Sequence, residues 1–211
     1  MKKIFILGMI VFGLSFISCE TDSTDHISQV TYYANMSLNG DALVVLTQGE
    51  TYTEQGAEAE ASGEKLDVKT DGTVNTNKPS VYKIKYSAIN SDGFPAYVTR
   101  TVIVLSDKLS AIDLSGTFVR SGNNNIITKL DDRKYSCDNA TGYVDGNDKI
   151  TLEFYNIDDK QIYAPYQENT SKSGISAESN NGVITDQNNW KWSIIASSVF
   201  GPADRIFKRS N

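Results

Sequence analysis

The sequence predicts an all-β protein. Short segments of alternating apolar and polar residues are separated by Gly, Asn and Asp, and none keeps a helical period for more than a turn or two. In 82–88 aromatic and aliphatic residues alternate with lysine and serine, which is typical of a half-buried antiparallel strand. A short polar break at 106–110 separates two such regions. We therefore expect a β-sandwich over 29–106 and an antiparallel β-domain, barrel-like or half-barrel, over 113–211.

The first twenty residues have the pattern of a secretory signal. Lys2 and Lys3 precede an apolar run over 4–17 that ends at Ser18-Cys19. The run is shorter than the roughly 20 apolar residues that a membrane span needs. A cysteine directly after the cut resembles bacterial lipoprotein signal peptides, which implies a signal peptide over 1–18 and a diacylglycerol on Cys19. The alternative is ordinary secretion with Cys19 as a free thiol.

Residues 19–28 are acidic and polar, and we expect them to form a flexible tether. Acidic residues directly after the acylated cysteine resemble the export signal of Bacteroidetes lipoproteins. This resemblance implies a protein anchored by its N-terminal lipid in the cell outer membrane, facing outside. The membrane is thus the first expected partner.

The chain is acidic, with a formal net charge of −6, and loss of Lys2 and Lys3 would make it more negative. No cluster of lysine or arginine is present, so nucleic acid is not an expected partner. Cys137 is the one cysteine besides Cys19, so no disulfide framework is expected. The fold must therefore depend on its apolar core.

The first region contains several spaced sequence blocks in a fixed order. We expect strands over 31–36, 42–47, 65–69, 81–88 and 97–105, with a turn at 90–93. The blocks 38–41, 49–57, 79–86 and 99–104 resemble the Ig-like domain named after pesticidal crystal proteins, which is common in bacterial surface proteins. Ser80 stands where members usually carry glycine. The resemblance implies an Ig-like sandwich that acts as a spacer or adhesive module and has no catalytic residues.

The second region begins at 113–119 and continues as short segments typical of strands. These segments are 126–130, 134–137, 149–155, 161–166, 182–185, 190–196 and 204–208. Turns are expected at 123–125, 145–148, 157–159 and 179–182. The opening 114–118 resembles the C-terminal β-domain that follows this Ig-like module in Bacteroides outer-membrane lipoproteins of unknown function. It also resembles the Gly-x-Trp opening of lipocalins, with Phe118 in the position of the tryptophan.

Trp190 and Trp192 are the leading candidates for a ligand site. On a strand both indoles point to one face, and exposed paired indoles form a surface on which sugar rings stack. Tyr163, Tyr166 and Asn189 would complete such a glycan platform. The alternative is that both indoles belong to the core of the sheet.

No catalytic set is apparent. The pairs 131–132 and 158–159 are expected to be solvated turn carboxylates, and no Ser-His-Asp set, phosphate loop or metal cluster of cysteines and histidines is present. We expect no catalytic residues, no metal, no cofactor and no enzymatic activity.

These observations favour a lipid-anchored cell-surface protein that binds a glycan without catalysis, beside a polysaccharide uptake system with its outer-membrane transport proteins. The alternative is a structural or adhesive envelope protein that binds another protein through the Ig-like or C-terminal β-domain. A lipocalin-like pocket behind Phe118 is the third possibility.

Overall fold

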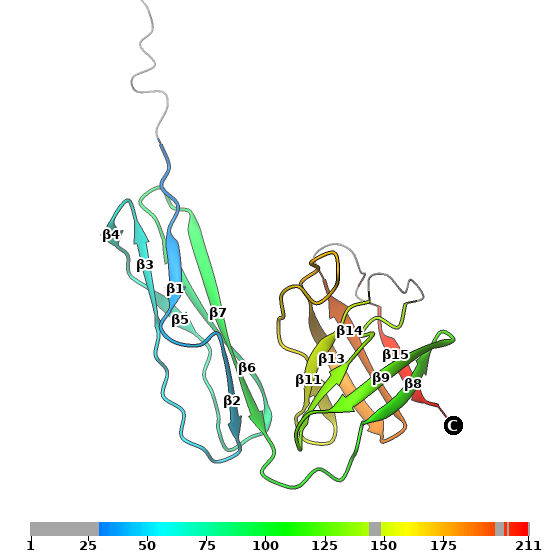
Figure 1. Ribbon diagram of the computed structural model, residues 1–211. Helices are drawn as coiled ribbons and strands as arrows, with labels where there is room; N and C mark the ends of the chain where they lie inside the picture. The colour runs from blue at the N-terminus through cyan, green and yellow to red at the C-terminus, as the bar shows by residue number, and fades with distance from the viewer. Residues whose placement is uncertain (1–29, 144–148, 197–200, 202, 211) are drawn as a thin grey trace, which may run out of the picture. The chain divides into compact units, whose positions relative to one another are not determined.

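The computed structural model describes residues 30–143, 149–196, 201 and 203–210 (Figure 1). Every regular element in this part of the chain is a β-strand, which confirms the all-β prediction. Within it, no helix is long and apolar enough to cross a membrane. The expected signal peptide over 1–18, Cys19 and the tether over 19–28 lie outside the described residues. Residues Tyr32–Asn211 form one compact unit.

Two sheets form the Ig-like sandwich. The first sheet has the order β1 (Asn35–Leu38), β3 (Ala57–Ala61) and β4 (Glu64–Lys65), and the second has the order β2 (Leu43–Thr47), β7 (Pro95–Leu105), β6 (Ser80–Ile89) and β5 (Lys69–Asp71). All pairs are antiparallel except β2 and β7, which run parallel. Ile84, Tyr86 and Val102 form the centre of the sandwich core.

Strand β6 follows the alternation expected from its sequence. Ile84, Tyr86 and Ala88 are buried, while Lys83 and Lys85 on the opposite face are exposed. The hairpin register places Tyr86 opposite Val98 and Ile84 opposite Arg100 on β7.

Strand β7 departs from alternation at its C-terminal end, where Val102, Ile103 and Val104 are all fully buried. Val102 packs into the sandwich core. Ile103 points to the other face and packs with Ile157 and Tyr163 from the second half of the chain. Both faces of the sheet are therefore covered at this point.

A buried arginine holds the loops of the sandwich together. Arg100 is 1% exposed and forms an ion pair with Glu54. Its Nε donates a hydrogen bond to the Asp41 carbonyl oxygen (2.9 Å), and its other guanidinium nitrogens donate to the Asn39 carbonyl and the Tyr86 hydroxyl. A buried charge needs such partners, since burial without them costs several kcal/mol.

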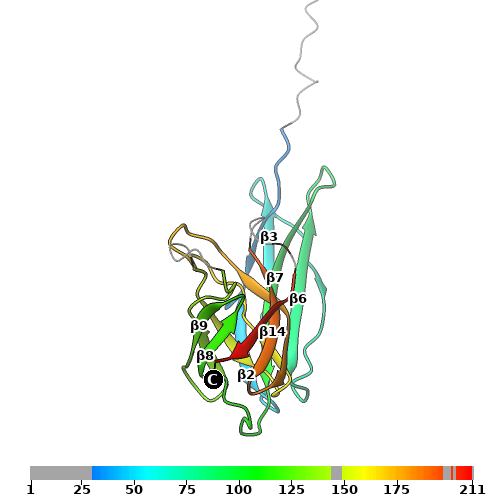
Figure 2. The ribbon, with the colours of Figure 1, turned by 90° about the vertical axis from the view of Figure 1, so that its right-hand side faces the viewer.

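Strands β8–β15 close into a barrel (Figures 1 and 2). The order around it is β10 (Lys134–Cys137), β11 (Leu152–Asn156), β12 (Gln161–Tyr163), β13 (Glu178–Asp186), β14 (Asn189–Ile195), β15 (Arg205–Arg209), β8 (Gly116–Arg120) and β9 (Asn123–Lys129). All neighbours are antiparallel. Of the two forms expected, the closed barrel is the one present. The division of the chain at 29–106 and 113–211 remains a prediction.

Two expected turns are wrong. Asn123–Asn125 lie inside β9, and the reversal before it uses Ser121 and Gly122, both with positive φ. Residues 179–182 lie inside β13, whose pairing with β14 shifts register between Asn180 and Val183. A β-bulge absorbs an extra residue where the sequence indicated a reversal.

Aromatic side chains fill the barrel. Trp190 and Trp192 are 1% and 0% exposed, and their ring centroids lie 4.9 Å apart at 81°. Phe207 stacks on Trp190 at 4.1 Å and 7°. Trp192 Nε1 donates a hydrogen bond to the Ala140 carbonyl oxygen (2.8 Å). Phe118, where a lipocalin-like pocket was considered, is fully buried against Trp190. An eight-stranded barrel has an interior that side chains can fill, as here.

We expect Trp192→Ala to lower the free energy of unfolding by about 3–5 kcal/mol, since it leaves a cavity and an unpaired carbonyl in the core. Guanidinium denaturation measures the change. Lys191→Ala is the matched control, because Lys191 faces outward on the same strand and pairs with Asp204 (2.7 Å). An exposed ion pair contributes less than about 1 kcal/mol. Equal losses in the two variants would contradict the core assignment.

Candidate functional site

The structure separates the five residues expected to bind ligand. Trp190 and Trp192 lie inside the barrel, so the exposed indole platform is wrong and the core alternative holds for both. The cause is barrel closure, which turns the shared face of the two indoles inward. Asn189 lies at the β13–β14 turn, where its side-chain nitrogen donates to both carboxylate oxygens of Asp186 (3.0 Å each).

Tyr163 and Tyr166 are brought near one cleft. The cleft has a volume of about 420 Å³ and is lined by Ala42, Leu43, Lys83, Thr99, Thr101, Pro165, Tyr166 and Glu178. Tyr166 follows β12 and is 60% exposed, so a face of its ring is open to solvent. Tyr163, at the end of β12, is 7% exposed and contacts the cleft through its hydroxyl, which donates a hydrogen bond to the lining residue Glu178.

A charged triad forms the polar part of the cleft. Lys83 Nζ and the Tyr163 hydroxyl each donate a hydrogen bond of 3.0 Å to Glu178 Oε2. Lys83 Nζ also lies 5.6 Å from the centroid of the Tyr163 ring. Lys83 comes from β6 and Glu178 from the start of β13, so the triad joins two distant parts of the chain.

The triad shifts the pKa of two of its members. Burial raises the pKa of Tyr163, and the nearby Lys83 charge only partly offsets that effect. Burial acts to lower the pKa of Lys83, but hydrogen bonds with Tyr163 and Glu178 outweigh it, so the net pKa is raised. At neutral pH the cleft therefore presents an ammonium group and an intact phenol.

A second cleft, of about 430 Å³, is lined in part by Asp131, Asp132, Arg133 and Lys134. Arg133 is committed to the fold: it pairs with Asp159 (3.0 Å) and donates to the Lys108 carbonyl (2.7 Å). The aromatic residue there, Tyr155, is half-buried with Lys134 Nζ 5.9 Å from its ring centroid. No open ring is offered among the residues lining this cleft, so the cleft at Tyr166 is the better candidate.

Both expected turn carboxylate pairs lie on the surface of the barrel, but Asp159 is more than a solvated group. Its carboxylate accepts hydrogen bonds from the Ser110 hydroxyl (2.6 Å) and the Asn156 side chain (2.9 Å). Within the described ranges, no group of three or more His, Cys, Asp or Glu residues is placed to hold a metal ion.

Lys83 and Glu178 were not singled out as site residues from the sequence. Lys83 has the alternation of a solvent-facing strand position, and Glu178 stands outside the strand expected at 182–185. They are 95 residues apart, and no local pattern relates them.

We expect Tyr163→Phe to lower the free energy of unfolding by about 1 kcal/mol at neutral pH, because it removes the hydrogen bond to Glu178. The pKa of Tyr163 is raised in the folded protein, so the unfolded chain ionises first. The contribution of Tyr163 is therefore complete below about pH 10, the ordinary value, and is lost as pH rises through the folded-state pKa. Denaturation curves of both proteins should converge in that range.

Tyr166→Phe removes an exposed hydroxyl from the same cleft and should change the free energy of unfolding by less than about 0.5 kcal/mol. A gap between wild type and Tyr163→Phe that stays constant into strong alkali would contradict the assigned role of Tyr163.

Comparison with known proteins identifies one domain of the chain. Residues 36–104 match the family model for the Ig-like domain of bacterial surface proteins. Among solved structures, a lipoprotein from Bacteroides thetaiotaomicron is 25% identical with a TM-score of 0.39, and the match covers 84% of this chain and 100% of that one. A structure of CBM51-2 in complex with GlcNAc and INT domains from Clostridium perfringens ZmpB is 13% identical with a TM-score of 0.31, over 84% of this chain and 48% of that one. A comparison with curated proteins returned no match. Residues 36–104 thus form an Ig-like domain of the type found in bacterial surface proteins.

Proposed function

We propose that the protein is a lipid-anchored, non-catalytic binding protein of the cell surface that holds a glycan in the cleft at Tyr166. The observation that carries the proposal is an exposed tyrosine ring beside a fixed Lys83–Glu178 pair in one cleft. The cell-surface setting is supported by the match of residues 36–104 to the Ig-like domain of bacterial surface proteins.

The chemistry of the cleft suits a sugar ring. The apolar C–H face of a pyranose stacks on an exposed aromatic ring such as that of Tyr166. Hydroxyl groups bind to charged and hydroxylated side chains, here Lys83, Glu178 and Thr101. A volume of about 420 Å³ lies at the small end of the range of ligand sites, so one or two sugar units would fit.

The lining of the cleft favours binding without hydrolysis. Glycosidases use two carboxyl groups on either side of the scissile bond. Among the described residues that line the cleft, Glu178 is the one carboxylate, and it is already engaged by Lys83 and Tyr163. The proposal therefore assigns no catalytic residue and no cofactor.

The proposed location is the outer face of the outer membrane, beside transport proteins for the bound polysaccharide. It rests on the acidic residues that follow Cys19 and on the signal pattern before it. Acyl chains on Cys19 would anchor the protein by burying methylene groups, at about 0.8 kcal/mol each.

We expect the protein to be retarded in native gels that contain one of xylan, galactomannan, starch or mucin glycans, and Tyr166→Ala to abolish the retardation. The stacking surface is lost while the fold is kept, since the side chain is exposed. Tyr143→Ala is the matched control, because Tyr143 is 61% exposed and does not line this cleft. Equal retardation of both variants, or none with any polysaccharide, would overturn the glycan assignment.

The anchor has its own test. We expect Cys19→Ala to move the protein from the membrane fraction to the soluble fraction, because no thiol remains for acylation. Immunoblots of the fractions and mass spectrometry of the N-terminal peptide measure the change, with Cys137→Ala as the control thiol substitution. Retention of Cys19→Ala in the membrane fraction would contradict the anchor.

A further inference from the structure

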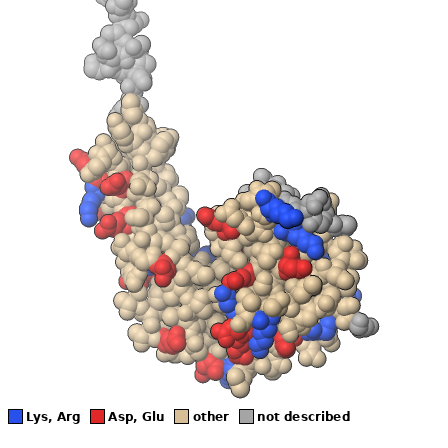
Figure 3. All heavy atoms as spheres, viewed as in Figure 1, with Lys and Arg blue, Asp and Glu red and all other residues tan. Residues whose placement is uncertain are grey.

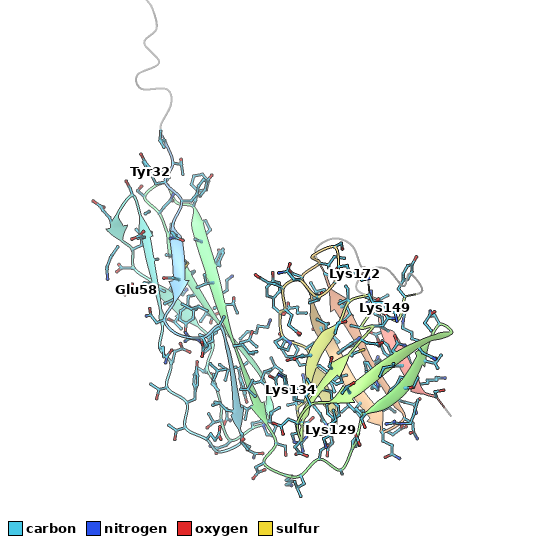
Figure 4. The ribbon with its side chains drawn as sticks, viewed as in Figure 1. Tyr32, Glu58, Lys129, Lys134, Lys149 and Lys172 are labelled. Carbon is cyan, nitrogen blue, oxygen red and sulfur yellow. The ribbon has the colours of Figure 1, made fainter. Side chains whose placement is uncertain are left out.

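One end of the sandwich carries a cluster of exposed apolar side chains. Tyr32, Tyr33, Ile89 and Phe94 are 56%, 69%, 62% and 45% exposed, and we call them the aromatic tip. The Tyr33 and Phe94 rings contact each other, with centroids 5.5 Å apart. Figure 4 labels Tyr32 at the end of the sandwich beyond β1.

A buried asparagine holds the tip in place. Asn90 is 4% exposed and begins the β6–β7 turn. Its side-chain nitrogen donates to the Tyr32 carbonyl oxygen (2.9 Å), and its side-chain oxygen accepts from the Phe94 amide (2.7 Å). Two segments 58 residues apart are thereby fixed side by side, so the exposed rings are presented by a built structure.

The tip carries little charge. Residues 32–35 and 87–97 contain one charged residue, Asp92. Figure 3 shows an uncharged end on the sandwich, with charged side chains beginning just below it on this face. Apolar and amphipathic side chains suit the interfacial layer of a membrane, where tyrosine is enriched.

The tip also lies close to Cys19 along the chain. Twelve residues lie between Cys19 and Tyr32. Covalent geometry limits such a segment to about 45 Å however it is arranged. A lipid on Cys19 would therefore keep the tip within reach of the bilayer at all times, at a high effective concentration.

We propose that the aromatic tip inserts into the headgroup layer of the membrane that holds the lipid on Cys19, and so orients the sandwich on the bilayer. This inference rests on the proposed lipid anchor. Four exposed side chains are few for a stable protein–protein interface, which buries more than about 1,000 Å². They are enough for a contact with the bilayer, because the lipid and the tether already hold the tip at a high effective concentration there.

The test uses the full-length lipidated protein in phosphatidylethanolamine–phosphatidylglycerol vesicles. A fluorophore is attached to Ser91→Cys, in the tip turn, or to Asp107→Cys, beyond the opposite end of β7, as the matched control. Cys137 is buried and does not compete for the label. Vesicle flotation reports anchoring, and quenching by headgroup spin-labelled lipid reports contact of the labelled site with the bilayer.

We expect both labelled proteins to float, with the label at Ser91→Cys quenched and the label at Asp107→Cys unquenched. Tyr33→Ser with Phe94→Ser should abolish the quenching at Ser91→Cys while flotation is kept, since the acyl chains remain. A protein that floats with an unquenched tip label, or with equal quenching at both sites, would overturn the inference alone. Failure to float would contradict the anchor as well, and the inference with it.

Discussion

Burial of both faces of β7 at Val102–Val104 is the constraint on which the rest of the structure depends. Val102 completes the sandwich core, and Ile103 packs against Ile157 and Tyr163 of the barrel. The backbone continues the contact, because the Ser106 amide donates to the Ile157 carbonyl oxygen (2.8 Å). The cleft at Tyr166 borders this apolar contact, and the Lys83–Glu178 pair bridges the two sides beside it. The packing of Ile103 against the second half of the chain therefore holds Lys83 and Glu178 close enough to pair.

The parts of the fold that follow from local pattern were predictable from the sequence. The alternation over 81–88 predicted β6, and 134–137 coincides with β10. The segment that became β3 was not predicted, because its alternating Ala57–Ala61 has neither β-branched nor aromatic residues. The burial of Arg100 could not be predicted from its strand, because the carbonyl groups and the carboxylate that bind its guanidinium come from distant loops.

The candidate site shows the same limit more sharply. A strand pattern places Trp190 and Trp192 on one face but does not say whether that face becomes the inside of a barrel. The pairing of β8 with β15 closes the barrel and turns that face inward, and no local sequence pattern predicts this pairing. Tyr166 was named only as a companion of the two indoles, at the end of a strand expected over 161–166, and its loop position was not foreseen. Lys83 and Glu178 acquire meaning only once the chain has folded.

The burial of Cys137 determines when its thiol can be oxidised. Its sulfur lies inside the closed barrel, and burial raises the pKa of the thiol to about 12. Oxidants attack the thiolate, and each oxidised form would add a polar group inside the apolar core of the barrel. The finished barrel thus shields this sulfur from peroxide in the surroundings. We therefore expect Cys137 to be oxidised only before the barrel strands have paired. A polar group added at that stage would oppose closure of the barrel.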